Sequence, residues 1–167
     1  GRCVAEGPYA PWARTYAIAQ PEPEQRVVTY SKHIALNEQE NNRSTVCTFA
    51  NEQSIREIYR EPFEMAVEEG GSLGIMTSMN RVGAVYSSSD YGLCTAVLKD
   101  EWGFKGVVIT DFVSGPSSKV VPREMVLAGT DLFLCTASDT SMFVDNYAND
   151  ADILNALRDS AHRICYT

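Results

Sequence analysis

Several hallmarks of common protein classes are scarce or absent in this sequence of 167 residues. Lysine and arginine number only 14 against 22 aspartates and glutamates, so the formal net charge is −8 at pH 7. Such a chain should repel phosphate backbones and anionic lipids, and we expect no nucleic acid and no membrane as partners. The apolar runs are far shorter than the ~20 residues that span a bilayer, so no transmembrane or signal segment is expected.

The residues that build metal sites and disulfide frameworks are also few. The five cysteines are an odd number with no Cys-x-x-Cys pair, which argues against a disulfide framework and a zinc knuckle. We expect most of them to be buried thiols in a reducing, cytoplasmic compartment. Only His33 and His162 are histidines, so no metal site is expected. The spacings of dinucleotide, P-loop, hydrolase-elbow and zincin motifs are missing as well, and no cofactor is expected.

What remains is the composition of one globular domain, with 44% hydrophobic and 22% charged residues. Residues 1–25 hold four of the seven prolines and little periodicity, which predicts an irregular entry segment. Residues 26–167 show a regular pattern and form the expected domain. The sequence begins without methionine and ends directly after a helical pattern, so we expect a piece of a larger protein.

Short apolar strands alternate with helical patterns along residues 26–167. The expected strands lie at 27–30, 73–77, 107–110 and 132–134. The helical patterns that follow them lie at 55–67, 93–102, 123–127 and 153–164. This order is typical of an α/β fold, a parallel sheet covered by helices. Four βα units are half of an eightfold barrel, and a complete barrel needs ~200 residues or more. We therefore expect either an open sheet or about half of a TIM-type (β/α)8 barrel.

Polar residues follow the expected strands, where the active sites of parallel α/β sheets gather. Asp111 comes directly after the strand 107–110. Its carboxylate either faces a common pocket or caps a helix or loop, and its position leaves both readings open. Lys32 and His33 follow the first strand, either as a surface pair or as groups that bind a neutral sugar or steer charge. The stretch 37–43 is dense in hydrogen-bonding groups, a pattern that a solvated loop also explains.

Several motifs, in order along the chain, closely resemble family 3 of the glycoside hydrolases, the β-glucosidase group. They are Lys32-His33-Ile34-Ala35-Leu36-Asn37, Met76-Thr77-Ser78 with Asn80-Arg81, Glu101-Trp102-Gly103-Phe104-Lys105-Gly106, Val108-Ile109-Thr110-Asp111 and Ala128-Gly129-Thr130-Asp131-Leu132. The likeness spans residues 30–167 and implies the C-terminal part of the family's catalytic (β/α)8 barrel. It also implies the hydrolysis of β-linked glucosides with retention.

The same resemblance implies a role for individual residues. Asp111 matches the family's nucleophile, which attacks the anomeric carbon. Lys32 and His33 match a pair that binds hydroxyls of the sugar. Phe112 stands where an aromatic residue helps to shape the aglycone side.

Two further positions and one missing group complete the implied site. Arg2 matches a sugar-binding arginine, although the acidic stretch expected after it is absent. Met79 stands where the family has a tyrosine near the nucleophile, which removes a hydroxyl donor. No residue of this chain matches the acid/base, so that group would come from outside the chain.

The sequence is compatible with three hypotheses of function. The first is a β-glucosidase-like hydrolase, or a fragment of one, acting on a β-glucoside or oligosaccharide. The second is a catalytically silent sugar-binding or scaffold half-barrel, and the third is an open flavodoxin-like sheet for a phosphorylated ligand, which has no phosphate motif behind it. Half a barrel exposes strand edges and apolar surface, so we expect a homodimer or a complementary barrel fragment to cover them.

Overall fold

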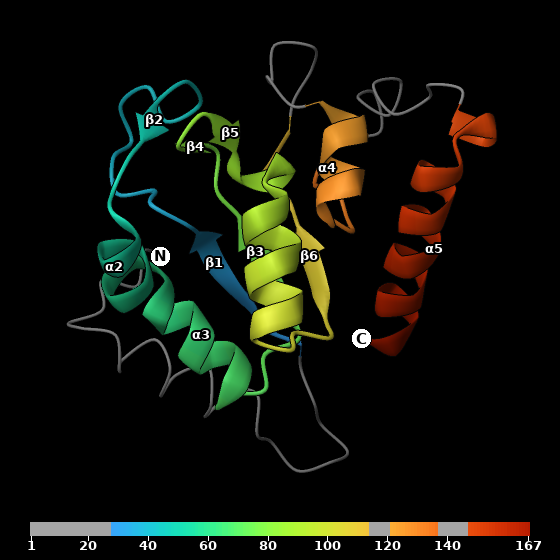
Figure 1. Cartoon of the computed structure of the whole chain (residues 1–167), viewed down its shortest axis with the longest axis horizontal. Helices are drawn as coiled ribbons and strands as arrows, with labels where there is room; N and C mark the ends of the chain where they lie inside the picture. Colours follow the sequence, from blue (N-terminus) through green and yellow to red (C-terminus); the bar gives the residue numbers. More distant parts are fainter. Residues whose placement is uncertain (1–27, 114–120, 137–146) are drawn as a thin grey trace.

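A three-stranded parallel sheet lies at the centre of the computed structural model, which describes residues 28–113, 121–136 and 147–167. Its strands are β1 (Tyr30–Ile34), β3 (Gly74–Thr77) and β6 (Val107–Ile109), in the order β1-β3-β6. All run in the same direction (Figure 1). Parallel bridges from Ile109 to Leu132 and from Val113 to Cys135 add a fourth extended segment beside β6. The expected parallel α/β architecture is confirmed.

Helices connect the strands, as parallel pairing requires. Between β1 and β3 run α2 (Glu52–Ser54), the wider helix η2 (Ile55–Arg60) and α3 (Glu61–Glu68). Between β3 and β6 lies η4 (Gly92–Glu101), and α4 (Pro122–Ala128) and α5 (Ala151–Tyr166) follow later. Short 3₁₀ turns, η3 (Ser87–Ser89) and η6 (Tyr147–Asn149), precede η4 and α5.

Local sequence explains where these helices begin and end. The side chain of Asn51 accepts a hydrogen bond from the Ser54 N–H at 2.8 Å and caps α2. Asp150 caps α5 in the same way, accepting from two N–H groups of its first turn. Gly129 ends α4 with a φ of 96°, a left-handed conformation that glycine adopts without steric cost.

A second, smaller sheet lies beyond the carboxyl ends of the central strands (Figure 1). It consists of β2 (Cys47–Thr48), β4 (Arg81–Val82) and β5 (Val85–Tyr86). β2 pairs with β4 in parallel, and β4 pairs with β5 through a hairpin that turns at Gly83, where φ is 62°. The sheet ties the loop after β1 to the loop after β3.

The hydrophobic core lies between the central sheet and the helices that cover it. Each central strand contributes one apolar side chain with no exposed surface, namely Ile34, Ile75 and Val108. Leu93 and Leu98 of η4 pack into the same cluster and are equally buried. Burying such side chains stabilises the domain by about 1.5–3 kcal/mol each, before the entropy cost of folding is counted.

A buried carboxylate fixes the last helix to the sheet. The Asp131 side chain has no exposed surface, and its Oδ1 accepts hydrogen bonds from Ser160 at 2.8 Å and from Arg163 at 2.7 and 2.9 Å. Its Oδ2 accepts from the Val108 N–H of β6 at 2.9 Å and lies 3.7 Å from the Lys99 ammonium. Burial lowers the pKa of Lys99, and the neighbouring Asp131 opposes that shift.

Several expectations shift in detail. The first strand is expected at 27–30, but β1 covers Tyr30–Ile34, so Lys32 and His33 lie inside the strand rather than after it. The fourth strand, expected at 132–134, is reduced to the isolated bridges beside β6. Between the expected strand 73–77 and the helical pattern 93–102, the structure adds β4, β5 and a 3₁₀ turn.

Other expectations concern burial and segments outside the sheet. Of the four cysteines that the structure describes, only Cys94 is buried, so the expectation of mostly buried thiols is wrong. Cys47 lies in the small sheet and Cys165 in the last turn of α5, where both are exposed, and Cys135 is half-buried. The entry segment 1–25 lies outside the described residues. Within the described ranges, no helix is long and apolar enough to cross a membrane.

Candidate active site

Asp111 lies at the carboxyl end of β6, where the chain leaves the sheet. The preceding residue, Thr110, is buried, and its hydroxyl accepts a hydrogen bond from the Leu134 N–H at 3.0 Å, which fixes the end of the strand. The Asp111 side chain is 14% exposed. Its Oδ1 accepts a hydrogen bond from the Phe112 N–H at 2.7 Å. Its Oδ2 is buried and has no hydrogen-bond partner among the residues that the structure describes.

Two nitrogen-bearing side chains face this open oxygen from different parts of the chain. His33 Nε2, from β1, lies 3.5 Å from Asp111 Oδ2. Arg43 Nη1, from the loop between β1 and β2, lies 3.7 Å from the same atom. Both distances exceed those of ordinary N–H···O hydrogen bonds. Asp111 Oδ2 therefore lies beside an imidazole and a guanidinium, and its hydrogen-bonding capacity is unused among the described residues, so we call it the open oxygen.

The protonation of His33 follows from its surroundings. Burial lowers the pKa of His33 below its ordinary value of 6.5, and the charges of Lys32 and Arg43 lower it further. Asp111 and Glu40 act in the opposite direction but do not reverse the shift. His33 is therefore neutral at neutral pH, and a neutral imidazole offers one hydrogen-bond donor and one acceptor.

Arg43 is the site residue that sequence reasoning missed. It belongs to the polar stretch 37–43, whose expected role was that of a solvated loop. The chain turns back at Asn42, where φ is 56°, and Arg43 Nε pairs with Glu40 Oε1 at 3.4 Å. The many polar residues of this stretch make it a candidate for binding. Its sequence has no periodicity, however, so it does not indicate which side chain faces the strand ends.

The other expected site residues have different positions. Lys32 is exposed on β1 and acts on His33 through its charge. Phe112 is 45% exposed beside Asp111. Met79 is half-buried in the bend between β3 and β4. Arg2 lies outside the described residues. The structure thus brings His33 and Asp111 together directly and places Lys32 and Phe112 one residue from them.

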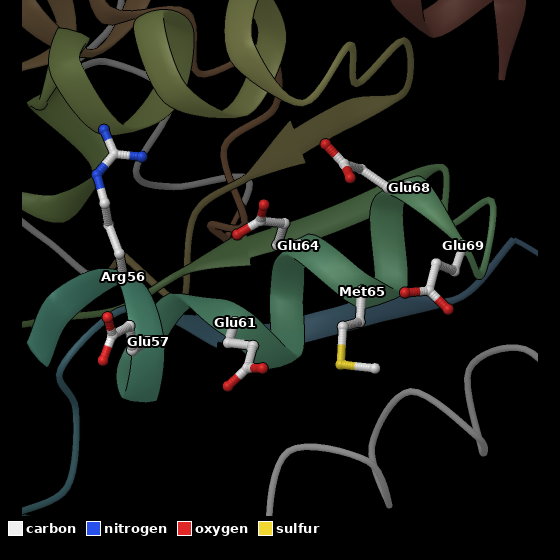
Figure 2. Close-up of a pocket in the computed structure, with 7 residues that line it drawn as sticks. All are labelled: Arg56, Glu57, Glu61, Glu64, Met65, Glu68 and Glu69. Carbon is white, nitrogen blue, oxygen red and sulfur yellow. The ribbon is translucent and has the colours of Figure 1, made fainter. Parts of the chain in front are cut away.

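A hollow elsewhere on the molecule does not coincide with these residues. It has a volume of about 390 Å³ and is lined by Arg56, Glu57, Glu61, Glu64, Met65, Glu68 and Glu69 (Figure 2). Burial and the neighbouring glutamates raise the pKa of Glu64 there. In the described part of the chain no group of three or more His, Cys, Asp or Glu side chains is placed to hold a metal ion. The hollow and the strand ends are thus separate places on the molecule, with no residue in common.

The fold and this site define an α/β domain that presents a carboxylate, an imidazole and a guanidinium at the carboxyl ends of its parallel strands. The family described as "Glycosyl hydrolase family 3 N terminal domain" matches residues 12–165. The chain belongs to this family.

Individual relatives agree with that assignment. A β-glucosidase of Rhizobium radiobacter is 37% identical over 130 residues, which are 78% of this chain and 15% of that protein. An exo-α-(1→6)-L-arabinopyranosidase of Bifidobacterium breve is 37% identical over 67% of this chain and 15% of its own length. The crystal structure of a β-glucosidase from Paenibacillus barengoltzii superposes with a TM-score of 0.78 and 31% identity, covering 97% of this chain and 19% of that one. This chain thus spans about 15% of the length of these curated relatives.

Proposed function

We propose that this chain carries the nucleophile and part of the sugar-binding site of a retaining, β-glucosidase-like glycoside hydrolase. The observation that carries the proposal is the open oxygen of Asp111, a buried Oδ2 without a hydrogen-bond donor among the described residues. Retaining glycosidases need a carboxylate oxygen that is free to attack the anomeric carbon. Membership of the family and the β-glucosidases among the relatives support a β-glucoside or oligosaccharide as the substrate.

The reaction proceeds in two balanced steps. Asp111 Oδ2 forms a bond to the anomeric carbon, while the bond from that carbon to the leaving oxygen breaks and its electron pair goes to the oxygen. The leaving oxygen takes a proton from an acid supplied from outside this chain. Water then attacks the anomeric carbon, releases the Asp111 carboxylate and gives its proton to the same external group.

The neighbouring side chains bind the sugar and its leaving group. The neutral imidazole of His33 donates to or accepts from a sugar hydroxyl, and the exposed ammonium of Lys32 donates to another. Arg43 presents its guanidinium to the same space as the Asp111 carboxylate. Phe112, through its exposed ring, covers the aglycone side. Arg2 completes the proposed sugar-binding set.

The central sheet represents consecutive strands of a TIM-type barrel, with residues 26–167 as the partial barrel domain and 1–25 as its entry segment. The support is the match to solved β-glucosidases that are several times longer than this chain. In the described part of the chain, β1 pairs with β3 on one side and has no strand on the other. A second copy of the chain or a complementary barrel fragment would pair with that edge.

One observation favours a second function, that of a catalytically silent sugar-binding or scaffold protein. Met79 offers a thioether, a weak acceptor, where the resemblance places a tyrosine hydroxyl near the nucleophile. A site without that donor and without its own acid/base can bind a sugar yet turn it over slowly. The two functions differ in whether Asp111 becomes covalently modified.

The test is the intact mass of the protein after incubation with 2,4-dinitrophenyl 2-deoxy-2-fluoro-β-glucoside. Dinitrophenolate leaves without protonation, so the missing acid is not needed for the first step. We expect a mass increase of one fluoroglucosyl group, mapped to the peptide that contains Asp111. Asp111→Asn should show none, whereas Asp100→Asn, which alters an exposed aspartate at the end of η4, should label like the wild type. A folded wild-type protein that binds glucose without labelling would support the silent sugar-binding function instead.

A further inference from the structure

Two side chains of the small sheet hold the backbone that directly follows Arg43. The Arg81 guanidinium donates through Nη1 to the Thr45 carbonyl at 3.0 Å and through Nη2 to the Tyr86 hydroxyl at 2.9 Å. That hydroxyl in turn donates to the Ser44 carbonyl at 3.3 Å. The guanidinium also lies over the Tyr86 ring, 4.2 Å from its centre. We call Arg81 and Tyr86 the clamp.

The partners of the Arg81 guanidinium in the clamp are a backbone carbonyl and a phenol rather than a carboxylate. No carboxylate lies within ion-pair distance of Arg81 among the described residues, although guanidinium groups commonly pair with carboxylates. Its planar donors instead bind one backbone carbonyl and one phenol, and the ring beneath them adds a cation–π contact. The Tyr86 hydroxyl uses both its donor and its acceptor capacity in this arrangement. The clamp therefore fixes a segment of backbone rather than neutralising a charge.

Further hydrogen bonds anchor the clamp to the strand that carries His33. The Arg81 N–H donates to the Val46 carbonyl at 3.0 Å, and the Thr48 hydroxyl donates to the Arg81 carbonyl at 2.6 Å. Asn80, which is fully buried, donates both to the Thr48 hydroxyl at 3.0 Å and to the Ala35 carbonyl at 3.1 Å. The loop between β1 and β2 is thus held at both of its ends.

Arg43 needs such support because its own contacts are weak. Its side chain is 36% exposed, and its nitrogen atoms lie 3.4 Å from Glu40 and 3.7 Å from Asp111. Ion pairs of this length near the surface contribute only about 0–1 kcal/mol. Fixing one backbone residue costs about 1–2 kcal/mol of conformational entropy, so these pairs alone do not hold the loop in place.

We propose that Arg81 and Tyr86 are positioning residues that hold Arg43 against the open oxygen of Asp111, a role that rests on the proposed function of Asp111. They do so through the carbonyls of Ser44 and Thr45, without contacting the reacting atoms. Through the small sheet, residues that follow β3 thereby influence where Arg43 lies relative to Asp111, which follows β6.

The titration of His33 reports where Arg43 lies, independently of any catalysis. The charged groups that act on His33 are Asp111 at the end of β6, Lys32 on β1, and Arg43 and Glu40 on the loop. Arg43 lowers the pKa of His33. Moving the guanidinium away therefore raises that pKa. The sequence has only two histidines, so His162, exposed on α5, serves as an internal control in the same spectrum.

The first experiment follows both histidines by NMR through a pH titration of the full chain. We expect Arg43→Gln to raise the pKa of His33, and Arg81→Gln and Tyr86→Phe to raise it in the same direction. Adding Arg81→Gln to Arg43→Gln should give no further rise, because the clamp acts through Arg43. The pKa of His162 should not move. Two results would overturn the proposal. One is a His33 pKa equal to that of the wild type in both folded clamp variants, and the other is a His33 pKa in the double variant that rises by the sum of the two single shifts.

The second experiment measures the rate of labelling by the fluoroglucoside. Arg81→Gln should slow labelling by roughly ten- to a hundredfold, as expected for a displaced site group, and the double variant with Arg43→Gln should be no slower than Arg43→Gln alone. Tyr91→Phe, which alters an exposed tyrosine beside η4, is the matched control and should label at the wild-type rate. Equal slowing by Arg81→Gln in the presence and absence of Arg43 would contradict a positioning role.

The two experiments separate the two proposals. If the wild type does not label, the proposed function fails, yet the His33 titration still tests whether the clamp places Arg43. If Arg81→Gln does not fold, Tyr86→Phe removes only a hydroxyl and keeps the ring under the guanidinium. Labelling of the wild type together with an unchanged His33 in Tyr86→Phe would retain the nucleophile and reject the clamp.

Discussion

Two aspartates near the same strand have opposite surroundings. Asp131 lies at the start of the segment beside β6 and is fully buried, and its two oxygens accept hydrogen bonds from Ser160, Arg163 and Val108. Asp111 lies at the end of β6, and its Oδ2 accepts no hydrogen bond from the described residues. A carboxylate with every acceptor site occupied cannot react, whereas one with an open oxygen beside cationic and polar groups can. Parallel α/β domains commonly place stabilising residues at the amino edge and chemistry at the carboxyl edge.

The two aspartates also differ in how their burial is compensated. Burial of a charged group is tolerated only when its partners replace the lost water, and around Asp131 they do. At Asp111 Oδ2 the neighbouring nitrogens stay at 3.5 and 3.7 Å. The resulting shortage of hydrogen bonds at Oδ2 costs stability, and under the proposed function a bound sugar would offset that cost.

Asp111→Asn should have the largest effect of any single change, and on labelling rather than on folding. The amide cannot attack the anomeric carbon, so the labelling rate should fall at least about 10⁴-fold. Only long ion pairs are lost, so the free energy of unfolding should change by less than about 1 kcal/mol. Intact mass and urea unfolding check the two parts. If the variant is still labelled on the peptide that contains residue 111, Asp111 is not the nucleophile.

Asp131→Asn should have the converse effect. The substitution leaves the partly buried Arg163 and Lys99 without their counter-charge, which should lower the free energy of unfolding by about 3 kcal/mol, the lower end of the range for a broken buried pair. Urea denaturation of both asparagine variants, measured side by side, gives the comparison directly. Equal free energies of unfolding for the two variants would contradict this prediction. They would show that the hydrogen-bonded Asp131 carboxylate stabilises the fold no more than the Asp111 carboxylate does.

Lys99→Met should have a smaller effect on the same network. Lys99 is mostly buried and donates a short hydrogen bond to the Gly129 carbonyl, besides its contact with Asp131. Its loss should destabilise the fold by about 1.5–3 kcal/mol, the range for hydrogen bonds to charged groups. Lys32→Met removes an exposed lysine on the Asp111 side and should change stability by less than about 0.5 kcal/mol. Thermal unfolding of both variants tests the difference.

The smallest effect should be a pH dependence of stability caused by His33, which lies beside Asp111. Because the pKa of His33 lies below 6.5 in the folded state, the unfolded chain binds more protons as the pH falls through the window just below that value. Stability should therefore decrease with falling pH in this window and be fully regained above it. Urea unfolding at several pH values should show the decrease in the wild type and in His162→Gln. It should be absent from His33→Gln, and its persistence there would assign the effect to another group.

Much of the architecture could be predicted from the pattern of apolar residues. Buried strands such as 73–77 and 107–110 are short apolar runs, and the helices between them repeat with the helical period, so their order follows from the sequence. The two-residue strands of the small sheet could not be predicted, because two residues have no periodicity. Their pairing depends on tertiary contacts between loops.

The candidate site was predictable in part for the same reason. The rule that chemistry gathers at strand ends selected Asp111 and His33, which the structure brings within 3.5 Å of each other. Arg43 could not be selected, since a turn at Asn42 and the clamp of Arg81 and Tyr86 bring it in from a polar stretch. The roles of these residues, the cytoplasmic location and the partner that covers the sheet edge stay predictions.

The bond from the Val108 N–H to the Asp131 carboxylate has a consequence for how the molecule opens. Asp131 also holds Ser160 and Arg163, so this one carboxylate joins the middle of β6 to α5, and departure of α5 would remove two of the groups that compensate for its burial. Amide hydrogens of α5 and of β6 should therefore exchange with solvent deuterium together, as one cooperative unit. Fraying of the last helix would then reach the strand that presents Asp111. The last helix and the strand that precedes Asp111 would share a single unfolding event.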